Sequence, residues 1–152
     1  MASLGHNTTV NTAIGALSHA VEGMLSVKAG EVSDLLAKES ISIICSLADD
    51  IAADTLTPAD RTKPLPASLF AGMVIANTGT AAVHAMGYSL TYYHEIDHGR
   101  ANGLLLGAFV AFCAQHLPDR TDAILKSGGF ESPAAFSEML AGLLGKRETL
   151  TD

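Results

Sequence analysis

The sequence predicts an all-α fold, a helical bundle that forms one domain over residues 1–152. Apolar residues recur with a helical period along most of the chain, and no segment keeps the two-residue alternation of a half-buried strand. Hydrophobic residues make up 48% of the chain and charged residues only 16%, which excludes a disordered chain. No low-complexity linker divides the sequence, and its length suits a single hydrophobic core.

The first third of the chain carries two apolar stripes with a helical period. The stripe of the first expected helix consists of Val10, Ile14, Leu17, Val21 and Met24. These positions follow one another at intervals of three or four residues, so they share one helix face. The second helix is expected from about Glu31 to Ala53. Its buried stripe is predicted to consist of Leu35, Ile41, Ile44, Leu47 and Ile51.

Proline, glycine and capping residues divide the middle of the chain. Thr57 followed by Pro58 is typical of a helix N-cap and first helical residue, and Asp60 completes a weak capping box. Residues 63–66 contain two prolines and are expected to form a rigid connector. A long helix rich in alanine and glycine follows, and Gly87 is expected to break or bend it.

Two further helices are predicted in the last third. Residues 88–97 are polar and aromatic without a period, so they are expected to be irregular. A helix is predicted for residues 101–116 and should stop before Pro118. The last helix is expected to run from the Ser132-Pro133 cap to about Leu144.

Charge and cysteine content narrow the classes of function. The formal net charge is −7, and no run of Lys or Arg occurs, which argues against nucleic acid or an anionic membrane as a partner. Cys45 and Cys113 lie in apolar stretches and are expected to be reduced core residues. The first nine residues lack the features of a signal peptide, and the longest apolar stretch, 104–114, is too short to span a membrane. A cytoplasmic protein is the expectation.

The six histidines differ in their surroundings. His6 and His116 lie in a polar segment and at a helix end, and both are expected at the surface. His19 shares a helix face with Gly15 and Glu22. Taken alone, this pattern fits a solvated histidine as well as a ligand.

A second cluster contains His84, and then His94 to His98 after a short gap. Imidazole suits zinc, iron and similar divalent ions, and a histidine at a helix end can converge with one at the start of the next helix. The same spacing also fits a buried, hydrogen-bonded His84 with His98 near a helix N-terminus. The spacing by itself does not distinguish a metal site from a buried, hydrogen-bonded His84.

Two strings resemble signatures of the iron-containing alcohol dehydrogenases. Residues 11–26, NTAIGALSHAVEGMLS, are similar to the family pattern D-A-L-[ST]-H-A-[IV]-E. Residues 71–106 resemble its second signature, in which two histidines fourteen residues apart precede G-x-A-N. His84 and His98 have that spacing, and Asn102 ends the pattern. The fold implied is the helical C-terminal domain of the dehydroquinate synthase-like, iron-containing alcohol dehydrogenases.

The resemblance implies a metal site with one departure. Family members hold the metal with one Asp and three His, and the histidines correspond to His19, His84 and His98. Gly15 stands where the Asp is expected. Loss of that carboxylate predicts weaker binding of Fe²⁺, or a shift towards Zn²⁺ with water as fourth ligand. Asp97 or Glu22 could replace it after rearrangement, although Asp97 is also placed to cap the helix that His98 begins.

A second departure is Tyr88, where many family members have a histidine close to the reacting nicotinamide. Tyr88 is therefore a candidate catalytic residue that donates a hydrogen bond or relays a proton. A packing aromatic is the alternative.

The resemblance also implies a reaction. In the family the metal polarises an alcohol or carbonyl oxygen while hydride passes to or from NAD(P). This chain has no Gly-rich phosphate loop and no βαβ pattern. We therefore expect a fragment whose N-terminal dinucleotide-binding domain is absent, which is inactive alone and binds NAD(P) only with that domain. The alternative is a degenerate, non-catalytic module for assembly that has lost its metal through Gly15. Self-association through the surface meant for the missing domain is expected to give a homo-oligomer.

Overall fold

The computed structural model describes residues 4–145, and all regular structure in that range is helical. The all-α prediction is therefore confirmed. A single 3₁₀ turn, Asp60–Thr62, accompanies the α-helices. The α-helices are α1 (His6–Leu25), α2 (Glu31–Ser46), α3 (Ala48–Ala53), α4 (Pro64–Thr78), α5 (Ala82–His94), α6 (His98–His116), α7 (Pro118–Gly128) and α8 (Pro133–Leu144).

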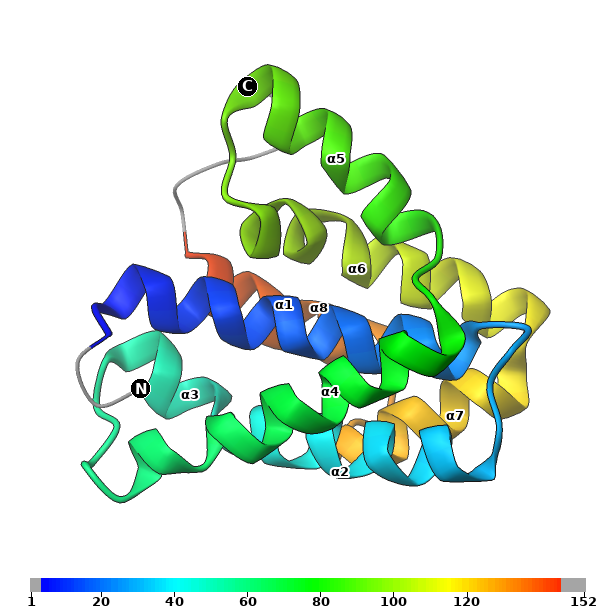
Figure 1. Cartoon of the computed structure of the whole chain (residues 1–152), viewed down its shortest axis with the longest axis horizontal. Coiled ribbons are helices and arrows are strands. Elements are labelled where there is room, and N and C mark those ends of the chain that lie inside the picture. Colours follow the sequence, from blue (N-terminus) through cyan, green and yellow to red (C-terminus); the bar gives the residue numbers. More distant parts are fainter. Residues whose placement is uncertain (1–3, 146–152) are drawn as a thin grey trace.

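Helix α1 runs through the middle of the bundle, with α4 and α2 on one side and α6 on the other (Figure 1). The whole predicted stripe of α1 is buried, as expected from its period. Burial extends to the opposite face as well, where Ser18 and Glu22 have no exposed surface. A helix surrounded by other helices must bury polar as well as apolar side chains, and those polar groups then need partners within the protein.

Glycine allows α6 to approach α1 closely enough to bring their side chains together. A Cβ atom on Gly99 would lie 1.9 Å from the backbone oxygen of Asn11, a distance that no side chain tolerates. On the other side of α1, a Cβ atom on Gly23 would lie 2.1 Å from a methyl group of Val74 in α4. These contacts fix α1 between α4 and α6 at backbone distance.

The helix predicted for residues 31–53 is interrupted. Leu47 leaves the helical region with φ −107° and ψ 1°, and α3 begins after it. The bend lets Leu47 and Ile51 both face the core. Leu35 was expected in the buried stripe but is 68% exposed. The stripe instead passes through Ala37 and Ser40, whose small side chains admit α4; the hydroxyl of Ser40 donates to the carbonyl of Ala67 at 2.9 Å.

The long helix expected from Pro66 breaks at Gly79, and the prediction of a break at Gly87 was wrong. Gly79 has φ +69° and ψ −179°, a conformation that other residues rarely adopt. Gly87 lies within α5, which continues through residues that were expected to be irregular and ends at His94. The last part of α5 lacks a hydrophobic period because its aromatic side chains face outward. Tyr92 and Tyr93 are 79% and 75% exposed.

The remaining boundaries follow the capping residues in part. Helix α4 begins at Pro64, inside the segment expected to be a connector, because proline is compatible with the first helical turn. The predicted bonds between Thr57 and Asp60 form, but they support only one 3₁₀ turn. Helix α7 was not predicted. Helix α8 has the expected bounds, and the hydroxyl of Ser132 accepts from the backbone N–H of Ala135 at 3.2 Å.

Both cysteines are free thiols, as expected. Burial raises the pKa of the Cys45 thiol to about 12 and also raises the pKa of Cys113. Neither thiol is activated for nucleophilic chemistry.

No single described helix is long and apolar enough to cross a membrane. The segments Asp60–Thr78 and Ala82–His94 reach that length and hydropathy only as a pair, which bends by 109° between them.

Candidate metal centre

Three helices bring together the histidines that the sequence singled out. His19 comes from α1, His84 from the first turn of α5, and His98 is the first residue of α6. The rings of His19 and His84 stack with centroids 4.8 Å apart, and the rings of His84 and His98 meet edge to face at 5.1 Å. Side chains separated by up to 79 positions in the chain therefore form one cluster.

The α5–α6 connection ends in a helix cap that orients His98. The Asp97 carboxylate accepts a hydrogen bond from the backbone N–H of Gly99 at 3.2 Å, as an N-cap residue does. This capping role for Asp97 was predicted. Gly99 in turn lies against α1, so the start of α6 is held at its backbone beside His19.

Glu22 holds the start of α5 from a different helix. Its side chain has no exposed surface, and one carboxylate oxygen accepts from the backbone N–H groups of Ala81, Val83 and His84 at 2.9, 2.9 and 3.3 Å. Amide groups at a helix N-terminus have no partner within the helix, so a carboxylate there is strongly favoured. This cap between distant segments was not predicted, because Glu22 and α5 are about sixty residues apart.

The second oxygen of Glu22 pairs with Nδ1 of His84. Both side chains are buried, with His84 only 2% exposed. A carboxylate can only accept, so Nδ1 carries the proton and donates to Glu22. The lone pair of His84 is therefore on Nε2. A carboxylate that fixes the tautomer of a histidine in this way is the usual outer partner of a metal-binding imidazole.

Asn102 lies between two of the imidazoles. Its side chain is completely buried on α6, one turn after His98. The amide nitrogen donates to Nε2 of His84 at 3.1 Å and to Nε2 of His98 at 3.3 Å. The ring nitrogens of two histidines thus face the same point, which the amide N–H groups occupy.

The imidazoles of His19 and His98 are held in their neutral form. Burial first, and then the neighbouring His84 and His98, lower the pKa of His19 to about 4. The pKa of His98 is lowered by burial first and by His84 second. At neutral pH the lone pairs of His19 and His98 are consequently not taken by protons, which a metal ligand requires.

The surroundings of Gly15 are open. A Cβ atom on Gly15 would meet only the Cα of Gly99, at 3.8 Å. Gly15, His19 and His98 line a cleft with a volume of about 270 Å³. Asp97 also lines this cleft, but its carboxylate accepts from the backbone N–H of Gly99 as the cap of α6. The carboxylate of Glu22 binds the start of α5 instead.

The donor set suits a divalent transition metal by its chemistry, because three neutral imidazoles are typical ligands of zinc and iron. The positions of the three histidine side chains fit a single metal ion only in part. Within residues 4–145 no group of three or more His, Cys, Asp or Glu side chains already has the arrangement that holds one metal ion. His84 and His98 converge through their Nε2 atoms, whereas the ring of His19 is stacked on that of His84.

Tyr88 lies at the mouth of this cluster. It is 60% exposed, and its ring stacks on His98 with centroids 5.5 Å apart. Tyr88 follows His84 by one turn of α5, which places both side chains on the same side of that helix. Its hydroxyl is therefore accessible to a molecule that approaches the histidines from solvent.

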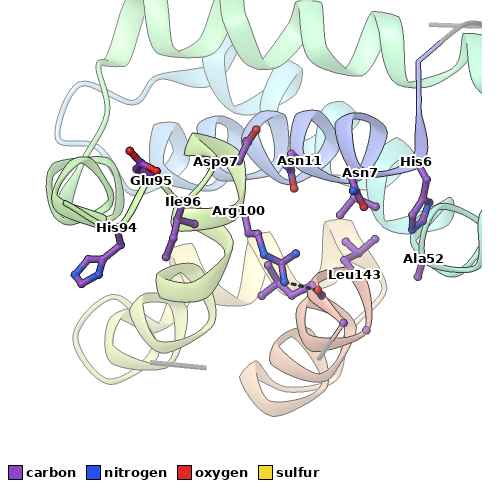
Figure 2. Close-up of a pocket in the computed structure, with 14 residues that line it drawn as sticks. His6, Asn7, Asn11, Ala52, His94, Glu95, Ile96, Asp97, Arg100 and Leu143 are labelled. Atoms are coloured by element: carbon purple, nitrogen blue, oxygen red, sulfur yellow. Dashed lines mark hydrogen bonds between the residues drawn. The ribbon is translucent and has the colours of Figure 1, made fainter. Parts of the chain in front are cut away.

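A second pocket lies beside the cluster and contains none of its three histidines. It has a volume of about 440 Å³ and is lined by the first turns of α1 and α6 and by the end of α8 (Figure 2). Arg100 crosses it and donates to the backbone oxygen of Leu144 at 2.7 Å (Figure 2). His6 lines it, 3.7 Å from Asp54. His116 lies at the end of α6, where its ring packs at a tilt against that of Phe112. His6 and His116 are thus outside the cluster, as expected.

Comparison with known proteins identifies the family. Residues 9–144 match the model of the Fe-containing alcohol dehydrogenase family, C-terminal domain. The chain belongs to that family. The resemblance stated from the two sequence signatures is thereby confirmed, and so is the helical fold of the C-terminal domain.

Relatives and solved structures agree with this assignment. The chain is 33% identical over 130 residues to long-chain-alcohol dehydrogenase 1 of Geobacillus thermodenitrificans, which covers 86% of this chain and 33% of the relative. It is 37% identical over 99 residues to 1,3-propanediol dehydrogenase of Klebsiella pneumoniae, covering 64% of this chain and 25% of the relative.

Among solved structures, an iron-containing alcohol dehydrogenase of Thermotoga maritima superimposes with a TM-score of 0.80 at 38% identity, covering 93% of this chain and 38% of that one. Sulfoacetaldehyde reductase of Bifidobacterium kashiwanohense in complex with NAD⁺ gives a TM-score of 0.84 at 27% identity, with coverage of 96% and 40%. This member of the Fe-containing alcohol dehydrogenase family therefore spans about a third of the length of the curated relatives it matches.

Proposed function

We propose that residues 1–152 are the metal-binding helical domain of an NAD(P)-dependent alcohol dehydrogenase or aldehyde reductase. The observation that carries the proposal is the cluster of His19, His84 and His98, with the tautomer of His84 fixed by Glu22. These three histidines would hold Fe²⁺ or Zn²⁺. When bound, the ion supplies a Lewis acid that polarises an alcohol or carbonyl oxygen.

The chain's own residues support that chemistry by position. Glu22 keeps the proton of His84 on Nδ1, so the lone pair that could bind an ion lies on Nε2, which now accepts from the Asn102 amide. Tyr88 is exposed beside His98 and is proposed to hydrogen-bond the substrate oxygen or to relay its proton to solvent. The proposal assigns the dinucleotide to a part of the protein outside these 152 residues. It is supported by the NAD⁺ complex of a structural neighbour, of which this chain covers 40%.

Metal titration of the purified chain tests the proposal. After treatment with chelator, the chain is expected to bind one Zn²⁺, or one Fe²⁺ without oxygen, and its melting temperature should rise because only the folded state presents the site. His116→Ala is the matched control, since His116 lies at the far end of α6. It should bind metal as the unchanged chain does. A chain that takes up neither ion in calorimetry contradicts the proposal.

A second candidate function is a non-catalytic helical module for assembly. It is favoured by Gly15 in place of the acidic ligand and by the stacked orientation of His19. This alternative predicts a melting temperature that does not respond to chelator or zinc, and a homo-oligomer in light scattering. A melting temperature that depends on chelator excludes it.

Gly15→Asp separates the two functions. The backbone at Gly15 has room for a Cβ atom, and the new carboxylate would enter the cleft beside His19 and His98. A carboxylate neutralises one unit of the ion's charge, so the affinity for Fe²⁺ or Zn²⁺ is expected to rise at least about tenfold. Calorimetry measures the change, with Gly15→Ala as the control for lost backbone freedom. If neither Gly15→Asp nor Gly15→Ala binds metal, the histidine cluster is not a metal site.

A further inference from the structure

The two ends of the buried Asn102 amide differ: within residues 4–145, its nitrogen is hydrogen-bonded and its oxygen is not. The side chain is completely buried, and its oxygen has no hydrogen-bond partner among the described residues. Its nitrogen faces Nε2 of both His84 and His98. A buried amide oxygen without a partner is rare, because its desolvation is not compensated.

The packing around Asn102 holds its side-chain amide in place. A Cβ atom on Gly87 would lie 2.3 Å from the amide oxygen, so the side chain rests directly on the backbone of α5. Rotation by a half-turn about the Cβ–Cγ bond needs no additional space, because oxygen and nitrogen exchange places and have nearly the same size. After such a rotation the oxygen would take the place where the nitrogen is now, facing His84 and His98.

The two distances from the Asn102 amide nitrogen to the histidine nitrogens are in the range found between ligands of one metal ion. Two donor atoms bound at about 2.0–2.2 Å to the same ion lie roughly 2.8–3.6 Å apart for angles between octahedral and tetrahedral. The amide nitrogen lies 3.1 Å from Nε2 of His84 and 3.3 Å from Nε2 of His98. Three lone pairs cannot face one another without a cation or proton between them, so the rotated amide is stable only with an ion bound.

We propose that Asn102 is the fourth protein ligand of the metal centre, through its side-chain oxygen, in place of the carboxylate that Gly15 lacks. Without metal, the amide nitrogen donates to the two imidazoles and keeps their lone pairs directed at the ion's position. With metal, the amide turns over and its oxygen joins His84 and His98. The proposal rests on the proposed function, because it needs a metal ion at the histidine cluster.

Zinc affinity of Asn102 variants distinguishes a ligand from a competitor. If Asn102 is a ligand, Asn102→Ala should lower the affinity for Zn²⁺ at least about tenfold, as the loss of metal-site partners typically does. If the amide only competes with zinc for the imidazole lone pairs, the same variant should bind zinc more tightly. Asn102→Asp has the same shape and adds a negative charge, so a ligand at this position predicts an affinity at least about tenfold above that of the unchanged chain.

The matched control is Asn77→Ala, whose exposed amide on α4 bonds only to the backbone of its own helix. Nuclear magnetic resonance gives a second readout. The side-chain NH₂ signals of Asn102 should shift on saturation with Zn²⁺ as the amide leaves the imidazoles, while those of Asn77 should stay unchanged.

The outcomes separate this inference from the proposed function. If the unchanged chain binds no zinc, both fail. If it binds zinc but Asn102→Ala binds equally or more tightly, only the role of Asn102 fails. If Asn102→Ala does not fold, Asn102→Asp decides, because binding no tighter than that of the unchanged chain overturns the role as ligand.

Discussion

Glu22→Ala is expected to lower the free energy of unfolding of the metal-free chain by about 3–5 kcal/mol. The carboxylate accepts from three backbone N–H groups at the start of α5 and pairs with Nδ1 of His84; the bonds to Val83 and His84 are buried, and the bond to Ala81 is partly buried. Truncation leaves those donors buried and without partners, and each such group costs about 1–3 kcal/mol. Urea denaturation followed by circular dichroism measures the loss.

The matched control for this prediction is Glu22→Gln. Its amide oxygen still accepts from the backbone of α5, so most of the stability should be retained. Its amide NH₂ group can only donate to Nδ1 of His84, which moves the imidazole proton to Nε2. Glu22→Gln should therefore fold but bind Zn²⁺ about 10–100-fold more weakly. Equal stability of Glu22→Ala and the unchanged chain would show that α5 does not depend on this cap.

The parts of the fold that the sequence predicted are those set by local spacing. The buried stripe of α1 was found from its period, and the bounds of α8 from the Ser132-Pro133 cap. The cap at Asp97 was predicted for the same reason, because its bond to Gly99 spans two residues. In each case neighbouring residues contain the whole signal.

The errors occur where contacts between distant helices decide the backbone. Gly87 has the composition of a helix break, yet it continues α5 because Asn102 packs on its bare Cα. Leu35 fits the period of α2 but lies outside the contact with α4, which small side chains make instead. No local pattern distinguishes a glycine that ends a helix from one that admits a neighbour.

The candidate site shows the same division. Its three histidines were proposed through the two family signatures, whereas the spacing alone left open a buried, hydrogen-bonded His84. The structure has that buried His84, bonded to Glu22, and also places it between His19 and His98. The two interpretations are therefore compatible, since a metal-binding imidazole needs an outer hydrogen bond. The contacts of Glu22 and Asn102 with His84 were not predicted, because these partners are about sixty and eighteen residues apart in the chain.

His84→Ala is expected to lower the affinity for Zn²⁺ or Fe²⁺ by more than about 100-fold, which is beyond the effect of outer-shell partners. His84 is the central ring of the cluster, in contact with both His19 and His98. Its removal leaves two imidazoles that no longer share a neighbour. Isothermal titration of the chelator-treated variant measures the loss.

His84→Ala is also expected to be less stable than the unchanged chain, so His98→Ala serves as its control. Removing His84 leaves the Glu22 carboxylate buried with one oxygen unpaired, so His84→Ala should also be less stable in urea. His98→Ala lacks this side effect, because the Nε2 of His98 bonds only to the Asn102 amide at 3.3 Å and its ring is half-buried. Loss of metal binding in both variants, with near-normal stability in His98→Ala alone, assigns the loss to the missing ligand. If either variant retains the affinity of the unchanged chain, the ion is bound elsewhere in the protein.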